Sequence, residues 1–305
     1  MNYYLGIDGG GTKTKFVMAN ELGHESEIIK VGPTSLVAVS QQQAQTNLEL
    51  GLEKICAQLD DDDLVTMAVM GLASVDSEAE EDQASKIFQP IFSKFPVEQF
   101  AVLNDVIPAL VNSTEQDNAI VLIAGTGSNC YGENDQGETA KAGGLDYLLT
   151  DQGSGYDIGL KVLRAAAKSY DGRGPKTILE EKLLKNFHVH EFVELKQKIY
   201  NPNLNKKQIA SLAELLAEAL AEKDEVAQMI LDWEANELWL MVETVAEKLG
   251  LAEKKFELIL EGSVVQMPEM IRILSRELKK YNPEASLVLP KKSAVYGALK
   301  LAKGE

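Results

Sequence analysis

The chain reads Gly6-Ile-Asp-Gly-Gly-Gly-Thr-Lys-Thr-Lys-Phe16 near its start. An apolar run precedes the three glycines and an alternating stretch follows them, so the segment predicts two strands joined by a hairpin turn over 9–11. Glycines let backbone N–H groups converge on an anion without intervening side chains. Hydroxyl and cationic side chains follow the glycines directly, at 12–14. We therefore interpret this turn as a phosphate-binding loop.

The spacing of the glycines excludes two common nucleotide-binding loops. A Walker A loop needs Gly-x-x-x-x-Gly-Lys-Ser/Thr at the start of a helix, and a Rossmann turn needs Gly-x-Gly-x-x-Gly between a strand and a helix. Neither pattern occurs in this segment. The remaining alternative is an ordinary hairpin turn, which would need only one or two glycines.

Length and charge limit the classes of protein and partner. A chain of 305 residues is long enough for two domains, because single cores rarely grow beyond about 250–300 residues. A formal net charge of −17 disfavours nucleic acid and anionic membranes as partners. No segment approaches the roughly 18 consecutive apolar residues of a membrane span, so we expect a cytoplasmic protein. Only two cysteines occur, Cys56 and Cys130, and they are not closely spaced, which argues against a zinc site or disulfide framework.

Apolar segments alternate with helical ones, which is typical of an α/β fold. Short strands are predicted over 64–73, 100–103 and 119–124, and again over 256–260 and 287–289. The spacing of Leu48, Leu52 and Ile55 predicts one face of an amphipathic helix.

In the second half, 211–249 is predicted to be almost continuously helical. Ser211 and Glu214 fit a capping box at its start. Further helices are expected over 270–280 and 293–303. Gly297 inside the last of these indicates close packing, since glycine in a helix costs about 1 kcal/mol relative to alanine.

The opening pattern repeats once. The segment 120–131 reads Ile-Val-Leu-Ile-Ala-Gly-Thr-Gly-Ser-Asn-Cys-Tyr, again an apolar strand, a glycine-hydroxyl turn and a second strand. This repeat predicts a duplicated fold in which two hairpins clamp the phosphates of one nucleotide.

With both turns located, the chain resembles the actin-like ATPase superfamily, and within it the N-acetylglucosamine kinase group of the BadF/BadG/BcrA/BcrD ATPase family. The motifs that carry the resemblance are the two turns, Asn104-Asp105, the glycine-rich segment 143–155, Glu261-Gly-Ser263 and Ala294-Val-Tyr-Gly-Ala298. The resemblance implies an α/β, actin-like ATPase fold. It consists of two ribonuclease H-like domains with mixed sheets flanked by helices and a nucleotide cleft between them. The implied domains are 1–114, with the C-terminal helix 291–305 packing back on it, and 115–290.

The resemblance also implies an activity, ATP-dependent phosphorylation of an amino sugar with ATP and Mg²⁺ as cofactors. N-acetylglucosamine is the first candidate, followed by glucosamine and N-acetylmuramic acid, and a homodimer is expected. The residues implied to bind the nucleotide are Gly9, Gly10, Gly11, Thr12, Lys13, Thr14, Gly125, Thr126, Gly127, Gly262 and Ser263.

Two carboxylates are candidates for the chemistry. Asp105 follows a predicted strand and precedes a predicted helix, and the resemblance makes it the general base that deprotonates the sugar hydroxyl. Its alternative role is to cap that helix. Asp8 ends the first strand beside the phosphate turn, where a carboxylate can hold hydrated Mg²⁺.

The sugar would be held by hydroxyl, amide and carboxylate groups, which can make paired hydrogen bonds to hydroxyl and N-acyl groups. The residues implied are Ser35, Asp105, Ser128, Asn129, Gly144, Leu145, Asp146 and Asp151. The chain departs from the family pattern at Ser35, Leu145 and Gln152, where the family has Asn, Trp and Glu.

Two other functions remain open. One is the other branch of the same family, an ATPase that activates a dehydratase through an iron–sulfur cluster and needs cysteine ligands at a dimer interface. The other is a non-catalytic regulator that binds sugar or nucleotide.

Overall fold

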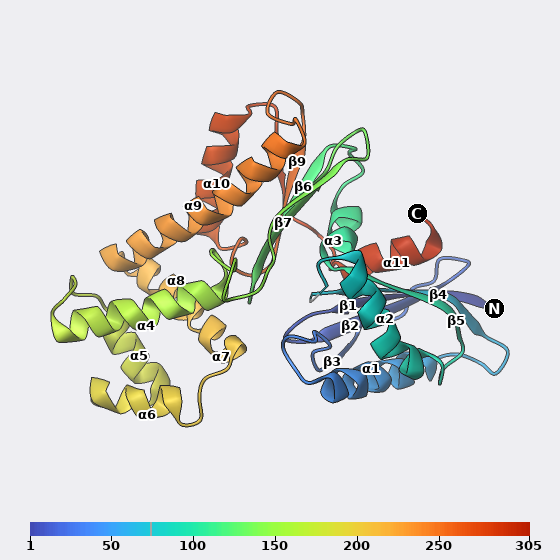
Figure 1. The fold of residues 1–305 in the computed structure, drawn as a ribbon, viewed down its shortest axis with the longest axis horizontal. Coiled ribbons are helices and arrows are strands. Elements are labelled where there is room, and N and C mark those ends of the chain that lie inside the picture. Colours follow the sequence, from blue (N-terminus) through green and yellow to red (C-terminus); the bar gives the residue numbers. More distant parts are fainter. Residues whose placement is uncertain (74) are drawn as a thin grey trace. The chain divides into compact units, whose positions relative to one another are not determined.

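The structure is a computed structural model in which residues 1–73 and 75–305 are described. It contains two compact units (Figure 1). Unit 1 comprises Met1–Gln116 together with Leu289–Glu305, and unit 2 comprises Asp117–Val288.

Unit 1 is built on a five-stranded mixed sheet. Its strands are β1 (Asn2–Gly9), β2 (Thr14–Asn20), β3 (Ile29–Val31), β4 (Leu64–Leu72) and β5 (Val97–Asn104). Their order in the sheet is β3-β2-β1-β4-β5. The first hairpin, β1 and β2, is antiparallel, whereas β1, β4 and β5 run parallel. The carboxyl ends of these three parallel strands therefore meet at one edge of the sheet.

Side chains alternate between the two faces of this sheet, as the period of a strand requires. Leu5 and Ile7 are buried in one core with residues of α1 (Gln41–Cys56) and α2 (Glu78–Phe92). Val17 and Ala19 are buried in a different core, with residues of the last helix, α11 (Val295–Lys303). The predicted face of α1 is confirmed, since Leu48, Leu52 and Ile55 are buried.

The last helix reaches β1 and α3 (Val106–Ser113) because two glycines leave room for it. A Cβ atom at Gly6 would lie 2.4 Å from the Val295 carbonyl oxygen. A Cβ atom at Gly297 would lie 1.8 Å from the Pro108 carbonyl oxygen. The close packing predicted for Gly297 is confirmed, and it joins α11 to α3.

Unit 2 contains a second five-stranded mixed sheet. Its strands are β6 (Ala119–Ala124), β7 (Ser128–Glu133), β8 (Thr139–Gly143), β9 (Glu257–Glu261) and β10 (Ser286–Val288). Their order is β10-β9-β6-β7-β8. Each strand has a counterpart in unit 1, because β6 pairs antiparallel with β7 and parallel with β9, as β1 does with β2 and β4. The repeated hairpin found in the sequence is thus part of a repeated sheet.

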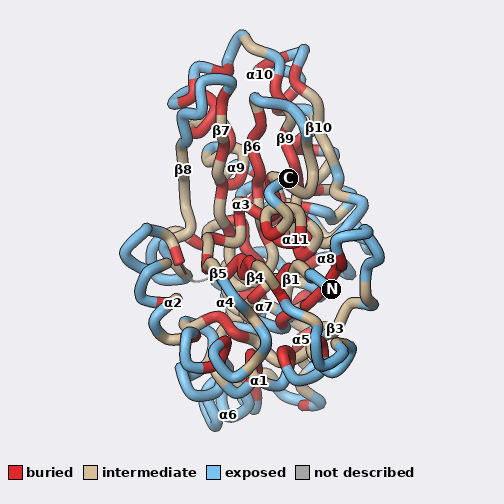
Figure 2. Tube along the Cα trace, turned by 90° about the vertical axis from the view of Figure 1, so that its right-hand side faces the viewer, coloured by how far each residue is buried: buried red, intermediate tan, exposed pale blue. Residues whose placement is uncertain are grey.

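The helices of unit 2 form its main core together with β6 and β9. They are α4 (Gly155–Asp171), α5 (Leu179–Phe187), the 3₁₀ turn η1 (Phe192–Glu194), α6 (Leu195–Tyr200), α7 (Lys206–Ser211), α8 (Ala213–Ala221), α9 (Glu225–Lys248) and α10 (Pro268–Tyr281). Figure 2 shows buried residues following the central strands of this sheet. Within the described part of the chain, no helix has both the length and the apolarity needed to cross a bilayer.

The stretch 211–249 is almost continuously helical, as predicted, but it is divided into separate helices. Three helices cover this part of the chain, and Ser211 ends α7 instead of capping a helix. The capping box lies earlier, where Asn205 and Gln208 bond reciprocally at the start of α7. A second start occurs at Asp224, whose side chain accepts the Ala227 N–H and caps α9. Polar cap residues therefore divide a region whose composition favours helix throughout.

Candidate active site

The first glycine-rich turn is longer than the sequence predicts. In the β1–β2 register Gly9 pairs with Thr14, and the Gly10 N–H donates to the Lys13 carbonyl at 3.2 Å. The turn therefore covers 10–13, not 9–11, and Gly9 ends β1. Thr12 and Lys13 are exposed at its tip.

The same register brings Lys15 opposite Asp8. The Lys15 ammonium lies 3.0 Å from Asp8 Oδ2 and 2.7 Å from Ser293 Oγ, so a cation and a carboxylate stand side by side next to the turn. Lys15 is not among the site residues predicted from the sequence. Counting the hairpin register from the correct turn would have identified it, because antiparallel pairing fixes which side chains are neighbours.

Thr14 and Ser35 lie inside this part of unit 1. Thr14 is fully buried, and its hydroxyl lies 3.0 Å from that of Thr34. The Ser35 hydroxyl donates to the Ala73 carbonyl at 2.9 Å. Both hydroxyls hold loops next to the turn in the structure.

One row of the sheet joins the turn to Asp105. Gly9 pairs with Leu72, and Leu72 pairs with Asn104, so Asp105 follows directly at the same edge. The Ala73 N–H donates to the Gly9 carbonyl at 3.0 Å and extends this connection. Unit 1 thus brings Asp8, the glycine-rich turn and Asp105 to the carboxyl ends of neighbouring strands.

Asp105 does not cap α3 through its side chain. It has helical dihedral angles, φ −63° and ψ −19°, and makes no side-chain capping hydrogen bond. Instead Asn104 Oδ1 accepts the Val106 N–H at 3.0 Å. The Asn104 amide also donates to the Val75 carbonyl at 2.6 Å, which fixes this residue in place. The alternative role of Asp105 as the helix cap is therefore not supported.

The second turn, over 125–127, lies in unit 2 and is held by the start of α4. The Gly155 N–H donates to the Gly125 carbonyl at 2.7 Å, and the Tyr156 N–H donates to the Thr126 carbonyl at 3.3 Å. Gly262 lies beside this turn with φ +109°, and a Cβ there would lie 2.4 Å from the Ala124 carbonyl oxygen. The loop predicted to hold adenosine, Gly262 with the exposed Ser263, is thus adjacent to the second glycine-rich turn.

Asp151 is the most enclosed carboxylate among the predicted sugar residues. It is 4% exposed, and its Oδ1 accepts the Ser128 N–H at 3.1 Å. The Ser128 hydroxyl donates to the Gln152 carbonyl at 2.7 Å, so Ser128 holds the loop that carries Asp151. Gly127 leaves room for the carboxylate, because a Cβ there would lie 3.0 Å from Asp151 Oδ2.

The other predicted sugar residues lie around this loop. Asn129 Oδ1 is buried and, among the described residues, has no hydrogen-bond partner. It packs against Gly144, where a Cβ would lie 2.8 Å from it. Leu145 is 56% exposed, and Asp146 has a left-handed backbone with φ 68°. An unpaired buried acceptor is costly, so Asn129 is suited to a ligand that donates a hydrogen bond.

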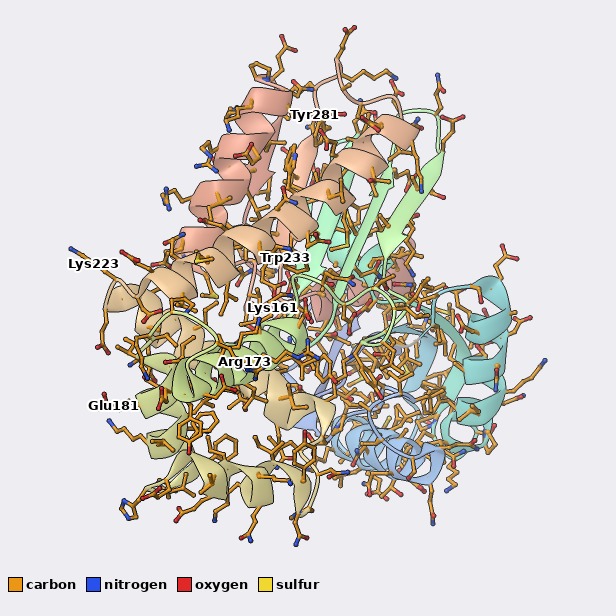
Figure 3. The ribbon with its side chains drawn as sticks, turned by 60° about the vertical axis from the view of Figure 1, so that its left-hand side comes forward. Lys161, Arg173, Glu181, Lys223, Trp233 and Tyr281 are labelled. Carbon is orange, nitrogen blue, oxygen red and sulfur yellow. The ribbon has the colours of Figure 1, made fainter. Side chains whose placement is uncertain are left out.

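The Asp151 loop is anchored by a buried carboxylate that is not among the predicted site residues. Glu234 of α9 is fully buried and accepts the Gly153 N–H at 2.7 Å. The Lys161 ammonium lies 2.9 Å from Glu234 Oε1 and 3.5 Å from the centre of the Trp233 ring (Figure 3). Burial raises the pKa of Glu234 to about 7, and Asp157 adds to this, against the opposing effect of Lys161. No motif marks Glu234 in the sequence.

Neither cysteine is suited to bind an iron–sulfur cluster at an interface. Cys130 is buried in the unit 2 core, and burial raises the pKa of its thiol. Burial also raises the pKa of Cys56 to about 11. Cluster ligands are thiolates, and these surroundings favour the neutral thiol.

Comparisons with known proteins place the chain in a family. The model of the BadF/BadG/BcrA/BcrD ATPase family matches residues 5–302. The chain is 34% identical to an N-acetylmuramic acid/N-acetylglucosamine kinase of Clostridium acetobutylicum, over 100% of this chain and 99% of that protein. It is 30% identical to the N-acetyl-D-glucosamine kinase of Dictyostelium discoideum, over 93% and 92%. A solved structure from Chromobacterium violaceum, a proposed N-acetylglucosamine kinase, has a TM-score of 0.78 at 22% identity and covers 98% of both chains.

Proposed function

Because the chain belongs to the BadF/BadG/BcrA/BcrD ATPase family, we propose that it is a kinase that transfers the γ-phosphoryl group of ATP to an amino sugar. The observation that carries this proposal is the row Gly9–Leu72–Asn104, which brings a glycine-rich turn and Asp105 to one edge of one sheet. Phosphoryl transfer needs positioned phosphates and a base near the accepting hydroxyl. The two relatives that are at least 30% identical, both kinases of N-acetylated amino sugars by name, support the choice of substrate class.

Asp105 is the proposed general base. Its carboxylate takes the proton from a sugar hydroxyl while that oxygen attacks the γ-phosphorus, and the bond to the β-phosphate oxygen breaks to release ADP. The placement of Asp105 after a strand end, with Asn104 satisfying the helix N–H instead, supports this role.

The nucleotide phosphates would be bound by backbone N–H groups of both turns and by nearby cations. In unit 1 these are the turn over 10–13 with Thr12, Lys13 and Lys15, while Gly9 and Thr14 support the turn from inside. In unit 2 the corresponding groups are Gly125, Thr126 and Gly127, with Gly262 and Ser263 beside them for adenosine.

Asp8 is the proposed Mg²⁺ residue. Among the described residues no group of three or more His, Cys, Asp or Glu side chains is placed to hold a metal. A lone carboxylate still fits Mg²⁺, which keeps several waters and is commonly bound through one or two carboxylates plus substrate phosphates. When bound, the ion would neutralise charge on the phosphates. Asp8 would exchange part of its contact with Lys15 for the hydrated ion.

The sugar would lie against Asn129, Gly144, Leu145, Asp146 and Asp151 in unit 2, with Ser128 holding the Asp151 loop. The buried acceptor on Asn129 favours a ligand N–H or O–H donor. A hexosamine supplies both. A cytoplasmic location and a homodimer complete the proposal.

A coupled assay of ADP formation tests this function. N-acetylglucosamine, glucosamine and N-acetylmuramic acid are compared with ATP and Mg²⁺, and mass spectrometry verifies the sugar phosphate. We expect sugar-dependent ADP formation with at least one of the three. ADP formation that is independent of every hexosamine would contradict the proposal.

A further inference from the structure

Lys206, at the start of α7, contacts both carboxylates proposed for the sugar site. Its ammonium is ion-paired with Asp146 Oδ1 and lies 2.7 Å from Asp151 Oδ2. It also lies 5.4 Å from the centre of the Tyr147 ring. All of these residues belong to unit 2. Neither the sequence motifs nor the assignments above give Lys206 a role.

The fold fixes the position of this lysine. The capping box of Asn205 and Gln208 sets the first turn of α7, and Lys206 is its first residue. Gly159 of α4 lets α7 approach closely, because a Cβ there would lie 2.0 Å from the Ile209 carbonyl oxygen. The Lys206 side chain is 24% exposed, so it lies mostly under cover of its neighbours.

The two carboxylates are also held in place. Asp151 uses Oδ1 to accept the Ser128 N–H, and this leaves Oδ2 facing Lys206. Asp146 is held in a left-handed backbone conformation, which is uncommon for residues other than glycine and concentrates at functional sites.

Lys206 stays protonated in this environment. Burial lowers the pKa of Lys206, but the hydrogen bonds and charges of Asp146 and Asp151 outweigh burial, so the net shift is upward. The three groups together carry a formal charge of −1. Their carboxylate oxygens can still accept hydrogen bonds from neutral O–H or N–H groups, since each carboxylate offers about four lone-pair positions.

We propose that Lys206 determines specificity in the sugar site. Its ammonium is already paired with the carboxylates of Asp146 and Asp151. The site therefore selects a hexosamine with a neutral N-acyl group over one with a free amine. The ammonium of a free amino sugar would compete with Lys206 for the same carboxylates and be repelled by it. A neutral N-acetyl sugar meets no such repulsion. This inference rests on the proposed kinase function and adds the preferred charge of the substrate.

The test compares kcat/KM for N-acetylglucosamine and glucosamine in the wild type, Lys206→Met and Lys207→Met. Lys207 is exposed on the same short helix, so Lys207→Met makes the same change in net charge away from the carboxylates. We expect the wild type to prefer N-acetylglucosamine. In Lys206→Met the ratio of kcat/KM for glucosamine to kcat/KM for N-acetylglucosamine should rise at least about tenfold, which corresponds to about 1.4 kcal/mol. Lys207→Met should leave it within about twofold, as expected for an exposed charge.

Two further measurements test whether the charge at position 206 sets this ratio. Lys206→Arg keeps the charge and should keep the wild-type ratio, whereas Lys206→Gln should behave like Lys206→Met. If Lys206→Met binds sugar without turnover, calorimetric dissociation constants for the two sugars provide the same ratio.

The outcomes separate the two proposals. A wild-type preference for glucosamine, or an unchanged ratio in folded Lys206→Met and Lys206→Gln, would overturn the role of Lys206. A wild-type protein that phosphorylates neither these sugars nor N-acetylmuramic acid would overturn the kinase function itself.

Discussion

Two neighbouring residues, Asn104 and Asp105, serve the start of α3 and the proposed proton transfer separately. Asn104 supplies the hydrogen bond to the first turn of α3 and is anchored by the Val75 carbonyl. The Asp105 carboxylate is therefore not needed to start the helix. This division supports a chemical role for Asp105 that can be removed without losing the helix.

Replacing Asp105 by Asn is expected to lower kcat by about 10²- to 10⁴-fold, the range for losing a general base. The affinity for ATP should change little, because the phosphate turns are unaltered. Steady-state kinetics and calorimetric titration with ATP measure the two effects. Asp82→Asn, which changes an exposed carboxylate on α2, is the matched control. Near-normal turnover by Asp105→Asn would show that another group accepts the proton.

Glu234 makes folding stability depend on pH. Burial raises its pKa from an ordinary value of 4.5 to about 7. A carboxyl whose pKa is raised in the folded state binds its proton more tightly there than in the unfolded chain. Its contribution to stability is complete below pH 4.5 and is lost as the pH rises through 7.

Glu234→Gln should remove this pH dependence while keeping an acceptor for the Gly153 N–H. Between pH 4.5 and 8 the free energy of unfolding of the wild type should fall by about 2–3 kcal/mol more than that of the variant. Urea unfolding at several pH values measures this. Glu247→Gln, an exposed change on the same helix, should follow the wild type. Parallel pH curves for wild type and Glu234→Gln would contradict the assignment.

At the scale of elements, the contact between α11 and α3 depends on the missing side chain of Gly297. A Cβ there would lie 1.8 Å from the Pro108 carbonyl oxygen and 3.0 Å from Asn112 Cβ. Backbone atoms cannot move aside as a flexible side chain can. The two helices would have to separate to accommodate even one methyl group.

Gly297→Ala is expected to lower the free energy of unfolding by about 1–3 kcal/mol, because overpacking outweighs the helix propensity gained. Urea unfolding measures the loss. Lys291→Ala, an exposed change shortly before the same helix, should stay within about 0.5 kcal/mol of the wild type, as surface changes usually do. Equal or greater stability of Gly297→Ala would mean that the helices tolerate a wider separation.

Strand periodicity and glycine spacing predicted much of the fold, including both hairpins and the helix α11. The local pattern could not reveal partners that are far apart in sequence. Nothing in the sequence near Glu234 indicates the Gly153 N–H that it accepts, 81 positions away. Likewise the ion pairs of Lys206 depend on how α7 packs against α4. The turn was misplaced because three consecutive glycines offer several hairpin registers, and Lys15 was missed with it.

At the scale of the whole molecule, unit 2 is a continuous stretch inserted into unit 1. The segment Leu289–Glu305 belongs with Met1–Gln116, while Asp117–Val288 has its own core. Without α11, the buried residues Val17 and Ala19 on one face of the unit 1 sheet would be exposed. Exposed apolar surface of this kind weakens folding at about 25 cal/mol per Å².

We therefore expect a fragment of residues 117–288 to unfold cooperatively on its own. A fragment of 1–116 should not, whereas 1–116 joined to 289–305 by a glycine-serine linker should regain a cooperative transition. Thermal unfolding followed by circular dichroism tests all three fragments. A cooperative transition in 1–116 alone would show that α11 is dispensable for this unit.

The return of α11 to the first sheet also has a consequence for biosynthesis. A ribosome releases β1 and β2 early, yet the helix that covers one face of their sheet leaves the exit tunnel after all of unit 2. Unit 2 can complete its core while the chain is still being made, although the N-terminal domain usually folds first during synthesis. The first strands must therefore remain with one apolar face uncovered until α11 emerges.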